Sequence, residues 1–110
     1  MKAGEQAEQQ AGRYLQQQGL KLIARNFRAR FGEIDLIMDD AGTLVFVEVR
    51  LRTGTDFGGA IASISPQKQK RIIRAARYYL TGLTRIPPCR FDVVLMDNDT
   101  VQWIRNAFET

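Results

Sequence analysis

Two carboxylates lie inside the most apolar stretch of this sequence, FGEIDLIMDDAGTLVFVEVRLR, which runs from Phe31 to Arg52. Asp35 belongs to the first apolar run and Glu48 to the second, and an Asp-Asp-Ala-Gly turn separates the runs. Two such runs around a glycine-containing turn predict a β-hairpin. Hard oxygen ligands on neighbouring strands suit magnesium or manganese, so this pair could support metal-assisted chemistry.

The length of the turn decides whether the two carboxylates meet. A two-residue loop pairs Asp40 with Thr43, a four-residue loop pairs Asp39 with Leu44, and both set Asp35 opposite Glu48. A three-residue loop would shift the register by one residue and separate the acids. In the register that sets Asp35 opposite Glu48, the Cβ atoms of these two residues lie roughly 4.5–5.5 Å apart. Such a placement of like charges costs stability in an ordinary sheet.

The charge of such a pair requires compensation, and the residues allow two forms of it. Arg50 follows Glu48 by two positions, so it shares a strand face with Glu48 and could form an ion pair that serves structure only. A divalent cation bound by both carboxylates is the alternative.

The remaining sequence predicts the elements that would hold this hairpin. A helix is expected over residues 3–18, with Gly19 as its C-terminal cap, and a second helix begins at Ser65-Pro66. Strands are expected at residues 20–31, 33–38, 43–51, 90–97 and 101–104. The order α-β-β-β-α-β-β predicts one α/β domain over residues 1–110, with a mixed five-stranded sheet flanked by helices.

The composition limits the catalytic systems that are possible and indicates the cellular compartment. The chain has no histidine, which excludes Ser-His-Asp and Cys-His nucleophile systems, and a single cysteine, which excludes an internal disulfide. Its start is polar, without the apolar core of a signal peptide, and no window has the length of a membrane span. We therefore expect a cytoplasmic protein.

Basic residues outnumber acidic ones, 16 to 12, and the formal net charge is +4. On the second helix they fall opposite the apolar face, where they could be a solvated surface or could contact phosphates. Others lie near strand ends or the start of that helix. The candidate nucleic-acid-binding residues are Arg28, Arg30, Arg52, Lys68, Lys70, Arg71, Arg74 and Arg77. Asp92, a third strand acid, is interpreted as structural and paired with a neighbouring arginine.

The set Asp35, Glu48-Val49-Arg50 resembles the core of the PD-(D/E)XK nuclease superfamily, in which an Asp precedes a Glu-x-Lys on the adjacent strand. The motifs GEIDLI, TLVFVEVR, Ser-Pro-x-Lys, RFDVV and IRNAF resemble, over nearly the whole chain, the YraN-like family of uncharacterised proteins, which is similar to archaeal Holliday-junction resolvases. AEQQAGRYL matches that family's Gly-Glu-x-x-Ala-x-x-Tyr-Leu element, with Ala7 in place of Gly and Glu8 as the acid.

The resemblance implies a restriction-endonuclease-like core and a metal-dependent phosphodiesterase site. Glu8, Asp35 and Glu48, with the carbonyl of Val49, would hold one or two Mg²⁺ or Mn²⁺ ions. The partner would be nucleic acid, most naturally branched DNA, and the resolvases suggest a homodimer.

Arg50 departs from the superfamily pattern, because arginine stays protonated and cannot act as a base where the nucleases carry lysine. Arg50 would still belong to the catalytic set through its charge, or Lys68 would supply an amine from elsewhere. Two alternatives to an endonuclease remain open: a nucleic-acid-binding module without turnover, and a protein-interaction domain whose acids are paired with Arg50.

Overall fold

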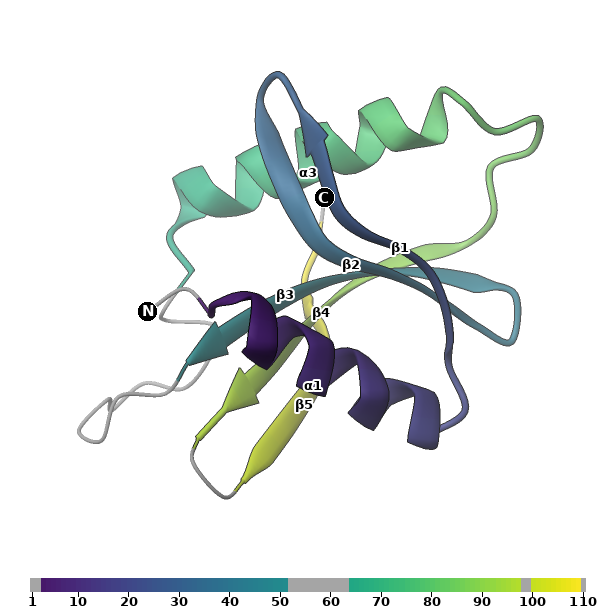
Figure 1. Ribbon diagram of the computed structural model, residues 1–110. Helices are drawn as coiled ribbons and strands as arrows, with labels where there is room; N and C mark the ends of the chain where they lie inside the picture. Colours follow the sequence, from purple (N-terminus) through teal and green to yellow (C-terminus); the bar gives the residue numbers. More distant parts are fainter. Residues whose placement is uncertain (1–2, 52–63, 98–99, 110) are drawn as a thin grey trace.

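The computed structural model describes residues 3–51, 64–97 and 100–109 and is shown in Figure 1. The elements follow the chain as α1 (Glu5–Gln17), β1 (Lys21–Ala29), β2 (Gly32–Asp40), β3 (Thr43–Leu51), α3 (Pro66–Leu80), β4 (Cys89–Met96) and β5 (Val101–Phe108). Within the described residues the strands form one five-stranded sheet in the order β1-β2-β3-β4-β5. β3 and β4 are parallel and the other neighbours antiparallel, which confirms the predicted mixed sheet and element order.

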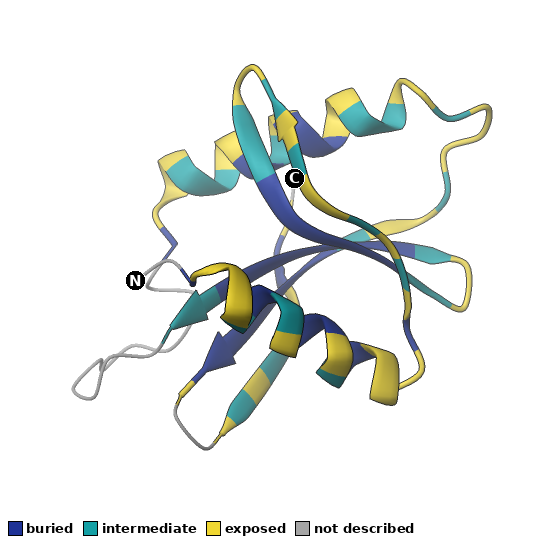
Figure 2. Ribbon diagram, in the orientation of Figure 1, coloured by how far each residue is buried: buried dark blue, intermediate teal, exposed yellow. Residues whose placement is uncertain are grey.

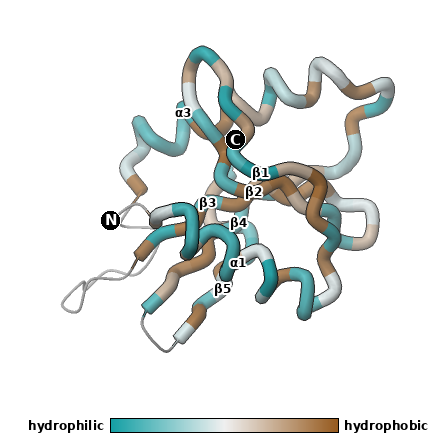
Figure 3. Tube along the Cα trace, in the orientation of Figure 1, coloured by the Kyte–Doolittle hydropathy of each residue, from teal (hydrophilic) through white to brown (hydrophobic). Residues whose placement is uncertain are grey.

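The two helices cover opposite faces of the sheet, and each face has its own apolar core. On the α3 side, Ile72 and Ala76 pack with Phe46 and Phe91, while on the α1 side Leu15 packs with Val47 and its neighbours. β3 is buried on both faces, which explains why its sequence is almost continuously apolar. Figure 2 shows this burial along the central strands, and Figure 3 shows their hydrophobic character.

The end of α1 and the start of α3 are those that the sequence predicts. The Ser65 hydroxyl accepts a hydrogen bond from the Lys68 N–H at 3.1 Å, and Pro66 follows as the first helical residue. Gly19 adopts a φ of +101° just after α1, the left-handed conformation in which glycine commonly terminates helices. Neither helix combines the length and apolar character that crossing a membrane would require, within the described residues.

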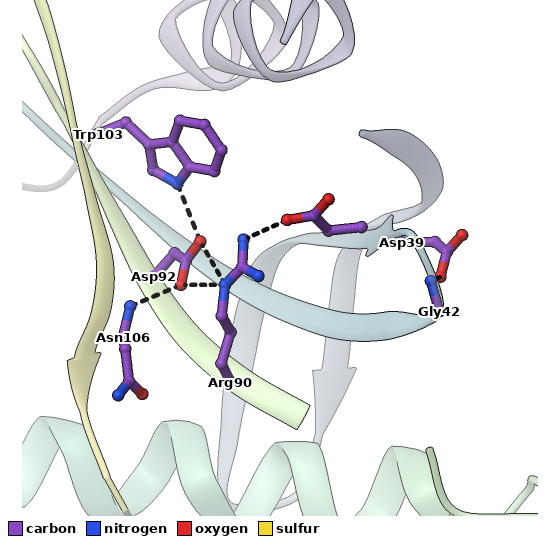
Figure 4. A network of polar contacts seen from close by, with 7 residues as sticks. Asp39, Gly42, Arg90, Asp92, Trp103 and Asn106 are labelled. Carbon is purple, nitrogen blue, oxygen red and sulfur yellow. Dashed lines mark hydrogen bonds and ion pairs between the residues drawn. The ribbon is translucent and has the colours of Figure 1, made fainter. Parts of the chain in front are cut away.

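The turn between β2 and β3 is the two-residue loop Ala41-Gly42, and both residues have positive φ, +50° and +96°. The Asp39 carboxylate accepts a hydrogen bond from the Gly42 N–H (Figure 4). Asp40 pairs with Thr43, and the register continues to Leu36 opposite Val47. The three-residue alternative is thereby excluded and the predicted register confirmed over these positions.

β5 is longer than the predicted strand over residues 101–104, because it continues to Phe108. The register shifts between Phe91 and Val93, and Asn106 takes a φ of +51°, a left-handed conformation that asparagine tolerates. This irregularity returns the chain to the core, where Phe108 stacks on Phe91 with ring centroids 5.0 Å apart. The polar residues Arg105 and Asn106 follow Ile104 and interrupt the apolar pattern, so the sequence did not predict this extension.

The sheet forks between its second and third strands. The ladder between β2 and β3 ends at Leu36 and Val47, whereas β2 stays paired with β1 as far as Gly32 and β3 stays paired with β4 as far as Leu51. In Figure 1 the β1–β2 hairpin accordingly bends toward α3 while β3 and β4 run together in another direction. Asp35 and Glu48 lie one step beyond the last pair, at the branch point.

Candidate functional site

A buried hydrogen bond joins the two strands where the ladder stops. The backbone N–H of Val49 donates to Oδ2 of Asp35 at 2.9 Å, so a carboxylate takes the place that a main-chain carbonyl would hold in a continuing ladder. Asp35 is 1% exposed, and a charge-assisted bond in such surroundings is short and strong. This bond fixes the Asp35 carboxylate against the residue that follows Glu48.

The side-chain alternation of β2 is broken at this point. Ile34 and Ile37 are three residues apart, yet both belong to the core on the α3 side. The Asp35 side chain is consequently directed along the sheet toward β3. On β3, Leu44 and Phe46 belong to the α3-side core, so regular alternation places Glu48 on that same side. Extending the β2–β3 register by one residue sets Asp35 opposite Glu48, and the hydrogen bond from the Val49 N–H fixes the orientation of the Asp35 side chain.

Glu48 and Arg50 form the ion pair that their spacing predicts. Nη1 of Arg50 lies 3.5 Å from Oε2 of Glu48, and the side chains are 15% and 1% exposed. Glu48 is thus a buried carboxylate beside a largely covered guanidinium. The ion pair offsets part of the cost of burying the Glu48 carboxylate.

Glu8 is buried on α1, at 6% exposure. It starts the buried face that continues with Ala11, Gly12 and Leu15, and α1 packs on β3 among other strands. In Figure 1 the first turns of α1 lie beside the end of β3. An acid in the first turn of a helix is stabilised by the N-terminal partial charge, which eases its burial.

Metal ligation at the fork would rest on carboxylate and carbonyl oxygens. No three acidic or cysteine side chains are gathered as a ready-made cation cage in the part of the chain that the structure describes. Magnesium commonly uses only one or two carboxylates and keeps several waters, so Asp35, Glu48 and the Val49 carbonyl are a chemically suitable donor set. Glu8 belongs to α1, which covers the face opposite the one assigned to Glu48, so it could join this donor set only through the opening between β2 and β3.

Asp92 is paired with a neighbouring arginine, as its sequence context predicted (Figure 4). Its carboxylate, fully buried, accepts hydrogen bonds from Arg90 Nε at 3.0 Å, Trp103 Nε1 at 2.9 Å and the Asn106 N–H at 2.9 Å. Arg90 also reaches Oδ2 of Asp40 at 2.8 Å. Burial alone would lower the pKa of the Arg90 guanidinium, but the bonds to Asp92 and Asp40 outweigh it and raise that pKa.

Six of the eight predicted phosphate-contacting residues meet at one surface. Two adjoining hollows, of about 600 and 720 Å³, lie between the β1–β2 turn and α3, and we refer to them together as the hairpin–α3 groove. Its basic lining residues are Arg28, Arg30, Lys68, Arg71, Arg74 and Arg77. Lys70 is exposed on α3 but lines neither hollow, and Arg52 lies outside the described residues.

Sequence reasoning missed two aromatic residues of this groove. Phe31 is 53% exposed and lines both hollows, and Tyr78 is 62% exposed and lines the larger one. The position of Phe31 in a turn could have indicated its exposure, because an aromatic residue in the two-residue Arg30-Phe31 loop has no strand face to bury it. The guanidinium carbons of Arg30 and Arg74 lie 5.6 and 5.5 Å from the Phe31 ring centroid.

The geometry defines a small mixed α/β protein with buried acids at a fork in its sheet and a basic groove beside one helix. Residues 7–96 match the model of the uncharacterised protein family UPF0102. The UPF0102 protein of Cupriavidus taiwanensis is 55% identical over 107 residues, which cover 96% of this chain and 82% of that protein. Relatives in Janthinobacterium sp. (strain Marseille) and Nitrosomonas eutropha are both 56% identical over 107 residues, covering 97% and 96% of this chain and 87% and 92% of theirs.

The chain therefore belongs to the UPF0102 family. This finding confirms the YraN-like family expected from its motifs.

Proposed function

We propose that this protein binds DNA and hydrolyses phosphodiester bonds with a divalent cation at Asp35 and Glu48. The observation that carries the proposal is the 2.9 Å bond from the Val49 N–H to Asp35, which holds one buried carboxylate against the strand that bears the other. Burying two acids beside each other costs free energy unless positive charge compensates them. Arg50 supplies positive charge to Glu48, and a divalent cation would supply it to both acids.

The donor set suits Mg²⁺ or Mn²⁺. Asp35, Glu48 and the Val49 carbonyl offer hard oxygens, and Glu8 is the additional acid from α1. A bound cation supplies Lewis acidity toward a phosphoryl oxygen and makes a bound water more acidic, which suits a chain without histidine.

The chain's own residues would orient and hold the charges. The Val49 N–H orients Asp35, and Arg50 keeps Glu48 in place at 3.5 Å. Arg50 remains protonated, so its contribution is a fixed positive charge for a phosphate and not proton abstraction. The groove between the β1–β2 turn and α3 would bind neighbouring phosphates of the same DNA.

Cleavage assays with matched variants test this function. Flap, fork and four-way-junction DNA would be incubated with the protein in Mg²⁺ or Mn²⁺. Asp35→Asn and Glu48→Gln preserve side-chain shape and should reduce cleavage by about 100-fold or more, since they remove charge at the cation. Asp39→Asn, in the same strand, should leave cleavage unchanged. Full cleavage by both Asp35→Asn and Glu48→Gln would refute the proposed cation site.

Glu8 receives its own comparison on one helix. Glu8→Gln replaces the buried acid of α1, and Glu5→Gln replaces an exposed acid in the same turn. A role in cation binding predicts weaker Mn²⁺ binding by calorimetry for Glu8→Gln alone. Equal affinities in the two variants would remove Glu8 from the donor set.

A second candidate function is DNA binding without turnover, and Arg50 favours it, because the nucleases it resembles carry a lysine there. Under this alternative the protein binds DNA in a salt-sensitive manner and no metal yields cleavage. Arg50→Lys then becomes informative: cleavage that appears only in this variant would identify a hydrolytic fold that the arginine has silenced, and Arg50→Gln is its control.

A further inference from the structure

The hairpin–α3 groove combines charge with exposed aromatic surface. Both of its hollows are lined by the β1–β2 turn on one side and by α3 on the other, and Phe31 and Arg74 belong to both. Phe31 therefore stands where the two hollows join. Tyr78 extends the aromatic surface into the larger hollow.

The charge of this groove fits a polyanion. Its charged lining residues are six cations and a single acid, Glu33. That acid is already close to Arg28, with Nε and Oε2 3.8 Å apart. A concave surface with one sign of charge concentrates ligands of the opposite sign.

The aromatic residues indicate which polyanion. Phe31 is half exposed, and the guanidinium groups of Arg30 and Arg74 lie within 6 Å of its ring. An exposed ring with arginines close by offers a stacking surface for a nucleobase, and the same arginines can bind its phosphates. A base paired inside a duplex is stacked on its neighbours, so only an unpaired base can lie on Phe31.

The two walls of the groove are held in a defined relation. A Cβ on Gly32, the residue after Phe31, would lie 2.7 Å from the Arg71 carbonyl oxygen, so the hairpin backbone directly approaches the helix backbone. Phe27 of β1 packs edge-to-face on Tyr79 of α3, with centroids 5.2 Å apart. The backbone segments that carry Phe31 and the arginines are thereby held in place before any ligand arrives, which reduces the ordering cost of binding.

We propose that this groove binds single-stranded nucleic acid, with phosphates along its arginines and one unpaired base stacked on Phe31. The proposal rests on the nucleic-acid-binding part of the proposed function and extends it to the strand type recognised. It concerns a surface separate from the acids at the fork. A protein that acts on branched DNA would use such a surface to hold an unpaired segment.

Anisotropy titrations with labelled oligonucleotides of one length test the proposal. The probes are oligo(dT), oligo(rU) and a mixed-sequence DNA duplex. Phe31→Ala should weaken oligo(dT) binding about tenfold and change duplex binding less than twofold, because stacking on one base is lost while the cations remain. Ile86→Ala, at another exposed apolar residue, is the control and should leave both affinities unchanged. Comparing dT with rU separates DNA from RNA as the source of the strand.

Phe31→Trp supplies a direct readout of stacking. Its emission, taken as the difference from the parent protein, should be quenched by oligo(dT) and not by the duplex, and its affinity should match the parent's. Unchanged oligo(dT) binding in Phe31→Ala, an equal loss on duplex, or poly-glutamate binding as tight as oligo(dT) would each overturn the proposal. If metal-dependent cleavage persists in those cases, the proposed cation site at Asp35 and Glu48 is still supported. If the protein binds single strands selectively but does not cleave DNA, only the proposal of hydrolysis is refuted.

Discussion

The backbone N–H of Val49 donates a hydrogen bond of 2.9 Å to Oδ2 of Asp35, across the point where β2 and β3 part. The bond closes the fork of the sheet with a charged side chain in place of a main-chain carbonyl. It also brings a buried acid to the residue next to Glu48. The Asp35–Val49 hydrogen bond therefore bears on both the stability of the fold and the proposed cation site.

The Asp35–Val49 contact allows stability and cation binding to be separated. Asp35→Ala leaves the buried Val49 N–H without this acceptor and should lower the free energy of unfolding by about 1–3 kcal/mol. Asp35→Asn keeps an acceptor oxygen, so its loss should be clearly smaller, while Mn²⁺ binding should fall in both variants. Urea denaturation and calorimetry measure the two quantities. Equal stabilities for the Ala and Asn variants would show that the bond contributes little.

Gly32 should be intolerant of any side chain. The Cβ of Gly32→Ala would lie 2.7 Å from the Arg71 carbonyl oxygen, so the hairpin must move away from α3. We expect a loss of about 1–3 kcal/mol, typical of overpacking, together with weaker oligo(dT) binding. Gly82→Ala is the matched control, since its Cβ would meet the Tyr79 carbonyl oxygen at an ordinary 3.6 Å. Thermal unfolding of the two variants gives the comparison.

The Asp92 network should determine stability and leave ligand binding intact. Asp92→Ala removes the acceptor shared by Arg90, Trp103 and Asn106 and leaves a largely covered guanidinium with Asp40 alone. A loss of about 3 kcal/mol is expected from breaking a buried charge pair. Urea unfolding checks this value, and the folded fraction should bind DNA as the parent does. Reduced affinity at full folding would assign Asp92 a functional role.

Arg74 should account for part of the salt dependence of DNA binding. Arg74 lines both hollows, whereas Lys70 on the same helix lines neither. Replacing one phosphate-contacting cation should reduce the slope of log K against log salt concentration by about 0.7 for a single strand. Arg74→Gln is expected to show this change and Lys70→Gln is not. Identical slopes in the two variants would mean that the groove does not contact phosphates.

Cys89 should react slowly for a surface thiol. Partial burial raises the pKa of the Cys89 thiol, and the reactive species is the thiolate. Between the ordinary and the raised pKa the folded protein keeps a proton that the unfolded chain has lost. Iodoacetamide should therefore modify the folded protein more slowly than the urea-unfolded chain in this pH window, and the small stability contribution of the thiol is lost as pH rises through it. Equal rates would show an unshifted thiol.

The local features of this protein could be predicted from its sequence. The turn at Ala41-Gly42, the Ser65-Pro66 helix start and the Gly19 helix end follow from the backbone preferences of single residues. The element order and the β2–β3 register follow from apolar periodicity and turn length. The common strand face of Glu48 and Arg50 and the exposed basic face of α3 could be predicted because side-chain direction along a strand or helix is a local property.

Only the tertiary structure decided how distant segments meet. The fork, the aim of Asp35 at Val49 and the extension of β5 to Phe108 depend on where strands stop pairing, which no local pattern encodes. Phe31 and Arg74 are far apart in the chain, and they share a groove because Gly32 lets the hairpin backbone approach α3 closely. Local propensities thus set the elements, and long-range packing of those elements set the sites.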